Sequence, residues 1–75
     1  MDCNKLKRRI AAAGYSQKSL AARLEMSHST LNRKVNGIVP FHTVEIEELC
    51  QILMIHDGAE RAAIFLGKAS QKWDL

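Results

Sequence analysis

The 75-residue sequence contains one proline, four glycines and two cysteines, and aromatic residues make up only 5% of it. So few aromatic residues leave an aliphatic core, and with 47% hydrophobic residues the composition favours a compact helical domain over a β-sandwich or a disordered chain. No apolar stretch approaches the length that spans a lipid bilayer, so a membrane role has no support. We expect a single small domain over residues 1–75, with a marginal core that dimerisation would steady.

Neither the cysteines nor the histidines are arranged as a catalytic or metal-binding set. Cys3 and Cys50 lie far apart and outside any CxxC motif. We expect reduced thiols in a cytoplasmic protein without a signal peptide, with Cys50 in the core. His28, His42 and His56 lack metal-ligand spacing, and no Ser/His/Asp or Cys/His set has a catalytic context. The sequence predicts no enzyme activity, cofactor, bound metal or small-molecule substrate.

Positive charge is concentrated in the first half of the chain. Residues 1–37 carry eight Lys and Arg against two Asp and Glu, a balance of +6, whereas residues 38–75 carry three against six, a balance of −3. Ordinary solvated surfaces would intersperse the two signs. We therefore predict that the first half meets a polyanion, with the basic cluster at residues 5–9 adding long-range attraction.

Helical spacing of apolar residues predicts five helices, three of them in the first half. The first occupies about residues 3–13 and ends at Gly14, which suits the left-handed conformation of a helix C-terminus. Ser16 is expected to cap the second helix and Ser27 the third, which ends at Asn36-Gly37.

The second half is predicted to hold a loop and two further helices. Pro40 keeps the loop extended. Thr43 is expected to cap the fourth helix, where Glu45 suits the positive end of the helix dipole. A weaker fifth helix ends at Gly67, and its apolar side is predicted from five residues: Ala59, Ala62, Ala63, Phe65 and Leu66. The tail, residues 68–75 with Trp73, shows no periodicity and is expected to be flexible or to form part of a dimer.

The second and third predicted helices, at about residues 16–37, have the layout of a helix-turn-helix that reads DNA. Ala21 is small where the two helices would cross, and Leu31 closes their shared core. Polar side chains of the third helix occupy an arc of about 140° on the side away from Leu31. They are His28, Ser29, Asn32, Arg33 and Asn36. A helix of this width fits the major groove, so this arc is predicted to face DNA.

Two kinds of contact are predicted from these residues. His28, Ser29, Asn32 and Arg33 are candidates for base edges, and a bidentate pair between Arg33 and guanine adds roughly 1–3 kcal/mol of discrimination. The free N–H groups at the helix starts suit phosphate oxygens, because helix N-termini attract anions. The residues that accompany them are Ser16, Gln17, Lys18 and Ser27, and Asn36 is placed to reach the backbone as well.

The motif resembles that of the lambdoid phage repressor and Cro family. The matching residues are Gln17, Ala21, Leu24 and Leu31, with the Asn36-Gly37 ending, and the stretch from Ser29 to Gly37 followed by Phe41 and Glu45-Ile46 looks most like short Cro-type repressors. The resemblance implies an all-α, five-helix, lambda-repressor-like fold and a homodimer that binds two half-sites of double-stranded operator DNA. It also implies base contacts by Gln17, His28, Ser29 and Arg33, and phosphate contacts by Ser27 and Asn36.

Two residues depart from the family pattern. Glu25 stands at the turn position that usually holds glycine, and a positive φ at a non-glycine residue costs roughly 1 kcal/mol. Lys34 stands where an apolar residue is frequent. Its stem is expected to pack while its ammonium reaches outward to a phosphate.

Other functions stay open at this stage. Seventy-five residues leave no room for the second domain of a lysogeny repressor, which favours a Cro-like regulator. An antitoxin that represses its own operon uses a similar fold, and a copurifying partner would reveal it. A third hypothesis is a protein-interaction module. Binding that is insensitive to salt would favour it.

Overall fold

The computed structural model describes residues 1–66, and within them it contains five α-helices and no strand. The helices are α1 (Cys3–Ala12), α2 (Gln17–Arg23), α3 (His28–Val35), α4 (Thr43–Ile52) and α5 (Gly58–Phe65). The predicted all-α fold with five helices is confirmed. The expectations for Gly67, Trp73 and the tail at residues 68–75 lie outside the described residues.

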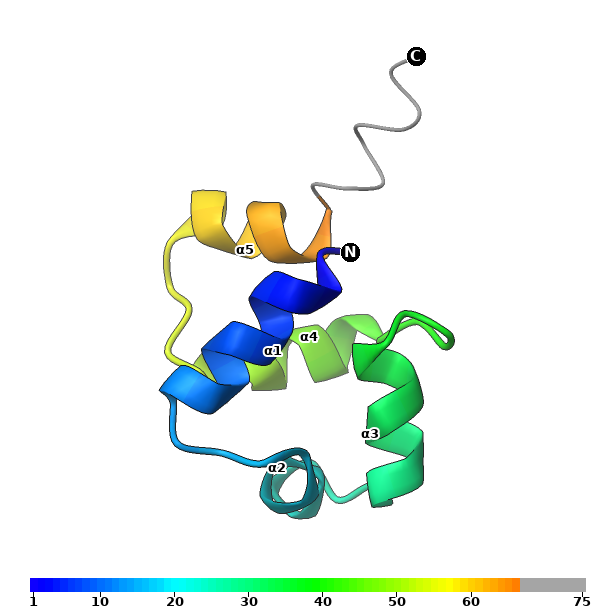
Figure 1. Ribbon diagram of the computed structural model, residues 1–75. Helices are drawn as coiled ribbons and strands as arrows, with labels where there is room; N and C mark the ends of the chain where they lie inside the picture. The colour runs from blue at the N-terminus through cyan, green and yellow to red at the C-terminus, as the bar shows by residue number, and fades with distance from the viewer. Residues whose placement is uncertain (67–75) are drawn as a thin grey trace.

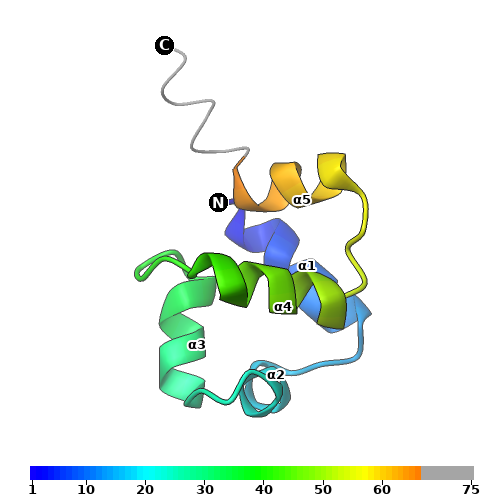
Figure 2. The same ribbon diagram turned by 180° about the vertical axis from the view of Figure 1, so that it is seen from behind.

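The helices are arranged around α1, which contacts both α3 and α5. The α2–α3 pair lies at one end of the molecule and α5 at the other, as Figures 1 and 2 show from opposite sides. The α4 helix lies on the far side of α1 in Figure 1 and on the near side in Figure 2. This arrangement leaves the outer surfaces of α2 and α3 uncovered by the other three helices.

The helix ends follow the predicted caps in the first half of the chain. The Ser16 hydroxyl accepts a hydrogen bond from the Ser19 N–H at 3.0 Å, and the Ser27 hydroxyl accepts one from the Thr30 N–H at 3.1 Å. Gly14, which follows the C-cap residue Ala13 of α1, has a φ of 86°, as expected for a glycine that ends a helix. The hydroxyl groups of Ser16 and Ser27 thus satisfy N–H groups that have no partner inside their own helix.

The cap of α4 was predicted one residue too late. His42 is the N-cap residue, and Thr43 is the first residue of the helix. The side chain of Glu45 explains the difference, because its Oε1 accepts a hydrogen bond from the backbone N–H of His42 at 2.9 Å. The Glu45 carboxylate, at the third position of the helix, thus accepts from the backbone N–H of the N-cap residue, which is one half of a capping box.

The core is aliphatic, as the composition predicts. Its buried members come from every helix: Leu6, Ile10, Leu20, Ala21, Leu24, Leu31, Val35, Leu49, Cys50, Leu53, Ile55 and Ile64. Cys50 is buried as expected, and both it and the half-buried Cys3 are free thiols. Phe41 and Phe65 pack edge to face at the border of this core, with ring centroids 6.4 Å apart.

The predicted apolar side of α5 is wrong at three positions, whereas Ala63 and Phe65 are half-buried as expected. The residue that α5 buries is Ile64, at 1% exposure, whereas Leu66 is 61% exposed, and Ala59 and Ala62 are exposed as well. Contact with the start of the chain decides this orientation, because the Asp2 N–H donates to the Ile64 carbonyl oxygen at 2.6 Å. A short helix with apolar residues on several sides is oriented by its partner rather than by its own spacing.

The turn between α2 and α3 holds Glu25 at a φ of 56°, so the turn keeps the backbone conformation that usually requires glycine. Replacing Glu25 with glycine is expected to make the domain more stable than Glu25→Ala by roughly 1 kcal/mol, because only glycine adopts this backbone without strain. Urea unfolding of both variants measures the difference. The alanine variant removes the same charge while keeping the strained backbone, so equal stability of the two variants would contradict the strain.

Candidate nucleic-acid interface

The α2 and α3 helices pack closely through small and aliphatic residues. Ala21 is 2% exposed and Leu31 is fully buried, and the Met26 N–H donates to the Ala21 carbonyl oxygen at 3.0 Å across the turn. Figure 1 shows α2 end-on and α3 from the side, so their axes cross steeply. This steep crossing holds α3 as a rigid ridge at the edge of the molecule.

The two sides of α3 differ sharply in exposure. Leu31 and Val35 are fully buried. Every polar residue of the predicted arc is exposed: His28, Ser29, Asn32, Arg33 and Asn36. The structure therefore places these candidate DNA contacts together on one outward surface, which we call the α3 arc.

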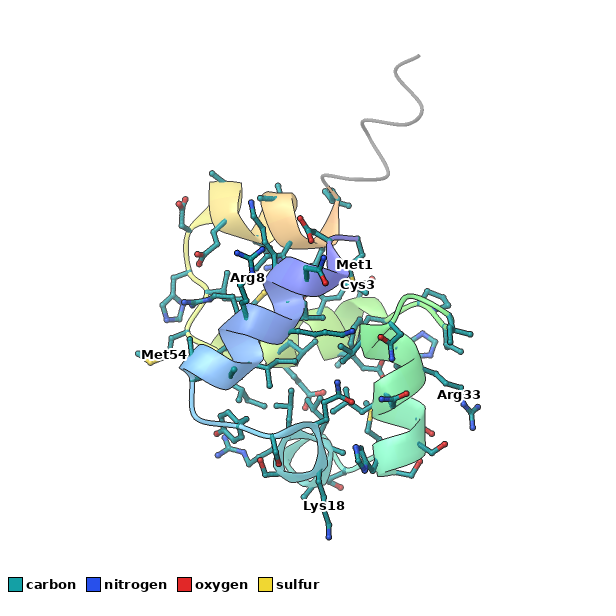
Figure 3. All side chains as sticks on the ribbon, in the orientation of Figure 1. Met1, Cys3, Arg8, Lys18, Arg33 and Met54 are labelled. Atoms are coloured by element: carbon teal, nitrogen blue, oxygen red, sulfur yellow. The ribbon has the colours of Figure 1, made fainter. Side chains whose placement is uncertain are left out.

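Arg33 extends from α3 into solvent, away from the rest of the molecule (Figure 3). Its Nη2 donates to the Ser29 hydroxyl at 3.1 Å, one helical turn earlier. This single bond leaves other N–H groups of the guanidinium for a ligand, since arginine carries five donors. Two of the predicted base contacts are thus neighbours that interact directly.

Gln17, at the start of α2, joins the α3 arc through a hydrogen bond that the sequence analysis missed. Its Oε1 accepts from Nδ2 of Asn32 at 3.0 Å. Asn36 extends the same chain, because its Nδ2 donates to the backbone oxygen of Asn32 at 2.8 Å and to Oδ1 at 3.3 Å. The α2–α3 crossing brings residues 17 and 32 together, and no local pattern signals such a pair.

The predicted phosphate contacts occupy the start of each helix. Lys18 points away from the body of the molecule in Figure 3. The hydroxyl groups of Ser16 and Ser27 are engaged in capping, and that of Ser27 also donates to Oγ1 of Thr30 at 2.8 Å. A phosphate at these helix starts would therefore bind mainly the backbone N–H groups that precede the capped N–H of Ser19 or Thr30.

Lys34 does not reach outward, and the prediction that its ammonium does so is wrong. The residue is 6% exposed, and its Nζ lies 2.6 Å from Oε1 of Glu45. The ammonium also lies 6.0 Å from the centre of the Phe41 ring. The Lys34 ammonium pairs with the Glu45 carboxylate and so links α3 to α4. Lys34 is therefore neither a base contact nor a phosphate contact.

The same pair gives the domain an acid-sensitive interaction. Burial raises the pKa of Glu45, but the hydrogen bonds from Lys34 and from the His42 backbone, with the nearby positive charges, hold the pKa below its ordinary value of 4.5. Because the pKa of Glu45 is lowered in the folded state, its ionised carboxylate stabilises the folded state above pH 4.5. This stabilisation is lost as the pH falls through the lowered pKa.

We therefore expect the free energy of unfolding to fall as the pH drops below 4.5, and to fall less steeply in Glu45→Gln. Urea unfolding at a series of pH values between about 3 and 7 measures this dependence. An identical pH profile for the two proteins would show that Glu45 contributes none of the acid sensitivity.

The basic cluster of α1 lies apart from the α3 arc. Lys5, Arg8 and Arg9 line a cavity of about 420 Å³ together with Asp57 and Glu60 of the α5 side. Nη2 of Arg9 donates to the Leu53 carbonyl oxygen at 2.9 Å and lies 3.6 Å from the Glu60 carboxylate. Figure 3 shows Arg8 at a distance from the labelled Lys18 and Arg33. These α1 side chains therefore face α5 and its acidic residues rather than extending the α3 arc.

Comparison with known families agrees with this arrangement. A profile of the helix-turn-helix domain family matches residues 4–64 of the chain. The chain belongs to this family. The match runs from α1 into α5 and therefore covers nearly all of the described unit, not only α2 and α3. Helix-turn-helix domains bind DNA with their second motif helix, and the chain is a DNA-binding regulator of this class. No curated protein and no solved structure gives a match.

Residues 1–66 contain neither a membrane-spanning helix nor a cluster of metal-ligating side chains. No helix among them is both long and apolar enough to cross a bilayer. The same residues contain no group of three or more His, Cys, Asp and Glu side chains placed to hold a metal ion.

Proposed function

We propose that this helix-turn-helix protein is a sequence-specific repressor of the Cro type that reads operator half-sites in the major groove with α3. The observation that carries the proposal is the division of α3 into a buried side, with Leu31 and Val35, and the exposed α3 arc. A rigid helix with hydrogen-bonding side chains along its outer surface matches what direct readout in the major groove requires. A regulator acts where its DNA lies, so we place it in the cytoplasm.

Within this proposal the side chains divide into readers and anchors. His28, Ser29 and Arg33 of the α3 arc face base edges, and Arg33 pairs with guanine. Lys18 and the first N–H groups of α2 and α3 hold phosphates and set the register of the protein on the duplex. Lys34 takes no part, because its ammonium is buried against Glu45.

Selection of binding sites from a random duplex library, at two salt concentrations, tests the proposal. The expected result is a consensus in two inverted halves whose centres are about one DNA turn apart. Affinity should fall as salt rises, because phosphate contacts release counter-ions. Retention of DNA that depends on salt but yields no consensus would contradict sequence-specific reading. Retention insensitive to salt would point to a protein-interaction module instead.

We also propose that the protein binds its operator as a homodimer. A single helix-turn-helix reads few base pairs, and a two-fold pair of them doubles the site. Sedimentation of the protein with a duplex of one half-site and with a duplex of two measures the stoichiometry. One chain per half-site, with affinity for the double site well above that for the single site, is expected. Equal affinity for the two duplexes would contradict a dimeric repressor.

A further inference from the structure

Three amide side chains form a continuous hydrogen-bonded chain across the junction of α2 and α3. Nδ2 of Asn32 donates to Oε1 of Gln17 at 3.0 Å. Nδ2 of Asn36 donates both to Oδ1 of Asn32 at 3.3 Å and to the Asn32 backbone oxygen at 2.8 Å. The middle amide is thus held from both sides, by the first residue of α2 and by the residue that ends α3.

These neighbours determine which way the Asn32 amide faces. Its nitrogen is directed to an oxygen of Gln17, and its oxygen to a nitrogen of Asn36. A half-turn of this amide would bring two oxygens together at Gln17 and two nitrogens together at Asn36. Gln17 can turn its own amide to follow, but Asn36 cannot, because its nitrogen is also bonded to the Asn32 backbone oxygen. The bond with Asn36 would therefore be lost, so the network selects one of the two orientations.

In this orientation Asn32 keeps one N–H donor and one oxygen lone pair for a ligand, because an amide offers two of each. In the major groove, adenine presents the matching pair, an acceptor at N7 beside a donor at N6. Guanine presents two acceptors there, and cytosine offers a donor. Among the bases, adenine is therefore the one that satisfies both remaining groups of Asn32.

Resting on the proposed function, we infer that Asn32 reads adenine and that Gln17 and Asn36 are positioning residues that hold its amide for this contact. Asn32 and Asn36 are exposed, and Gln17 is half-buried. In this role Gln17 and Asn36 orient Asn32, whereas the family resemblance implies a base contact for Gln17 and a phosphate contact for Asn36. None of the three is charged, so the unit adds base selectivity without adding to the salt dependence.

The sharpest test changes the hydrogen-bonding pattern of Asn32 without changing its shape. Asn32→Asp replaces the remaining donor with an acceptor, and Gln17 can turn its own amide to donate to the new carboxylate. A carboxylate accepts from N4 of cytosine. Site selection with this variant is expected to return the wild-type consensus with one adenine per half-site replaced by cytosine. The preference for adenine over cytosine there falls by roughly 10- to 100-fold or reverses.

Two substitutions at Gln17 test the positioning role. Gln17→Ala removes the oxygen that holds Asn32, and discrimination at the adenine position is expected to fall about 10-fold while discrimination at the guanine position stays unchanged. Gln17→Glu keeps that oxygen and is expected to restore the discrimination, even though its charge weakens binding to every duplex. Circular dichroism checks that each variant is folded.

Two results would overturn the inference. One is a consensus for Asn32→Asp that is the same as for the wild type at every position. The other is a loss of discrimination in Gln17→Ala that is equal at all positions, since a merely structural role would weaken every contact alike. Failure of the proposed function looks different, because the wild-type protein itself would then return no consensus, and the inference would fall with it.

Discussion

Replacing Glu45 with glutamine is expected to lower the free energy of unfolding by about 3 kcal/mol, because the Lys34 ammonium is then buried without its counter-ion. The pair is close, with 2.6 Å between Nζ and Oε1, and the two side chains are only 7% and 19% exposed. Glutamine keeps an oxygen for the His42 N–H, so the start of α4 is preserved and the change isolates the charge. Such a loss is a large part of the stability of a domain this small.

Urea unfolding followed by circular dichroism at pH 7 measures the effect, with two controls. Glu48→Gln, at an exposed position of the same helix, is expected to change the stability by less than about 0.5 kcal/mol. Adding Lys34→Met to Glu45→Gln is expected to recover part of the loss, because an apolar side chain replaces the unpaired ammonium. Equal effects of Glu45→Gln and Glu48→Gln would contradict the buried pair.

Replacing Arg33 with alanine is expected to remove the preference for guanine at one position of each half-site, with a loss of roughly 1–3 kcal/mol in discrimination. Arg33 is an exposed residue of the α3 arc, so its removal leaves the core intact. Equilibrium binding to the selected duplex, and to duplexes with each single base-pair change, measures the discrimination at every position.

Lys18→Ala is the matched control, because it removes a charge of the same sign at an exposed position outside α3. It is expected to weaken binding to all duplexes alike and to lower the slope of log affinity against log salt by about one unit. Arg33 and Lys18 variants that both lose affinity without any change in base preference would show that Arg33 contacts phosphate rather than a base.

Much of the fold follows from local rules that operate within a few residues. Ser16 and Ser27 cap their helices because a hydroxyl reaches an N–H three residues ahead, and Gly14 and Gly37 take the positive φ that ends a helix. The α3 arc is also local, since the period of the helix separates its polar residues from Leu31. These features need no knowledge of what lies across the core.

The features that could not be predicted depend on contacts between distant residues. Spacing within α3 places the stem of Lys34 on the buried side, beside Leu31 and Val35. The direction of its ammonium is decided by Glu45, which lies on another helix. The exposed side of α5 is decided by its contact with the N-terminal segment at Asp2 and Ile64. The pairing of Gln17 with Asn32 arises only when α2 and α3 cross.

The surface formed by α3 and the start of α2 is expected to meet the DNA. Amide chemical shifts of the isotope-labelled protein, recorded while a duplex with a single selected half-site is added, test it most directly. The largest changes are expected on residues 16–19 and 27–37, with small changes on α5 and at the basic cluster of α1. Largest changes along α1 and α5, with residues 27–37 unaffected, would contradict it.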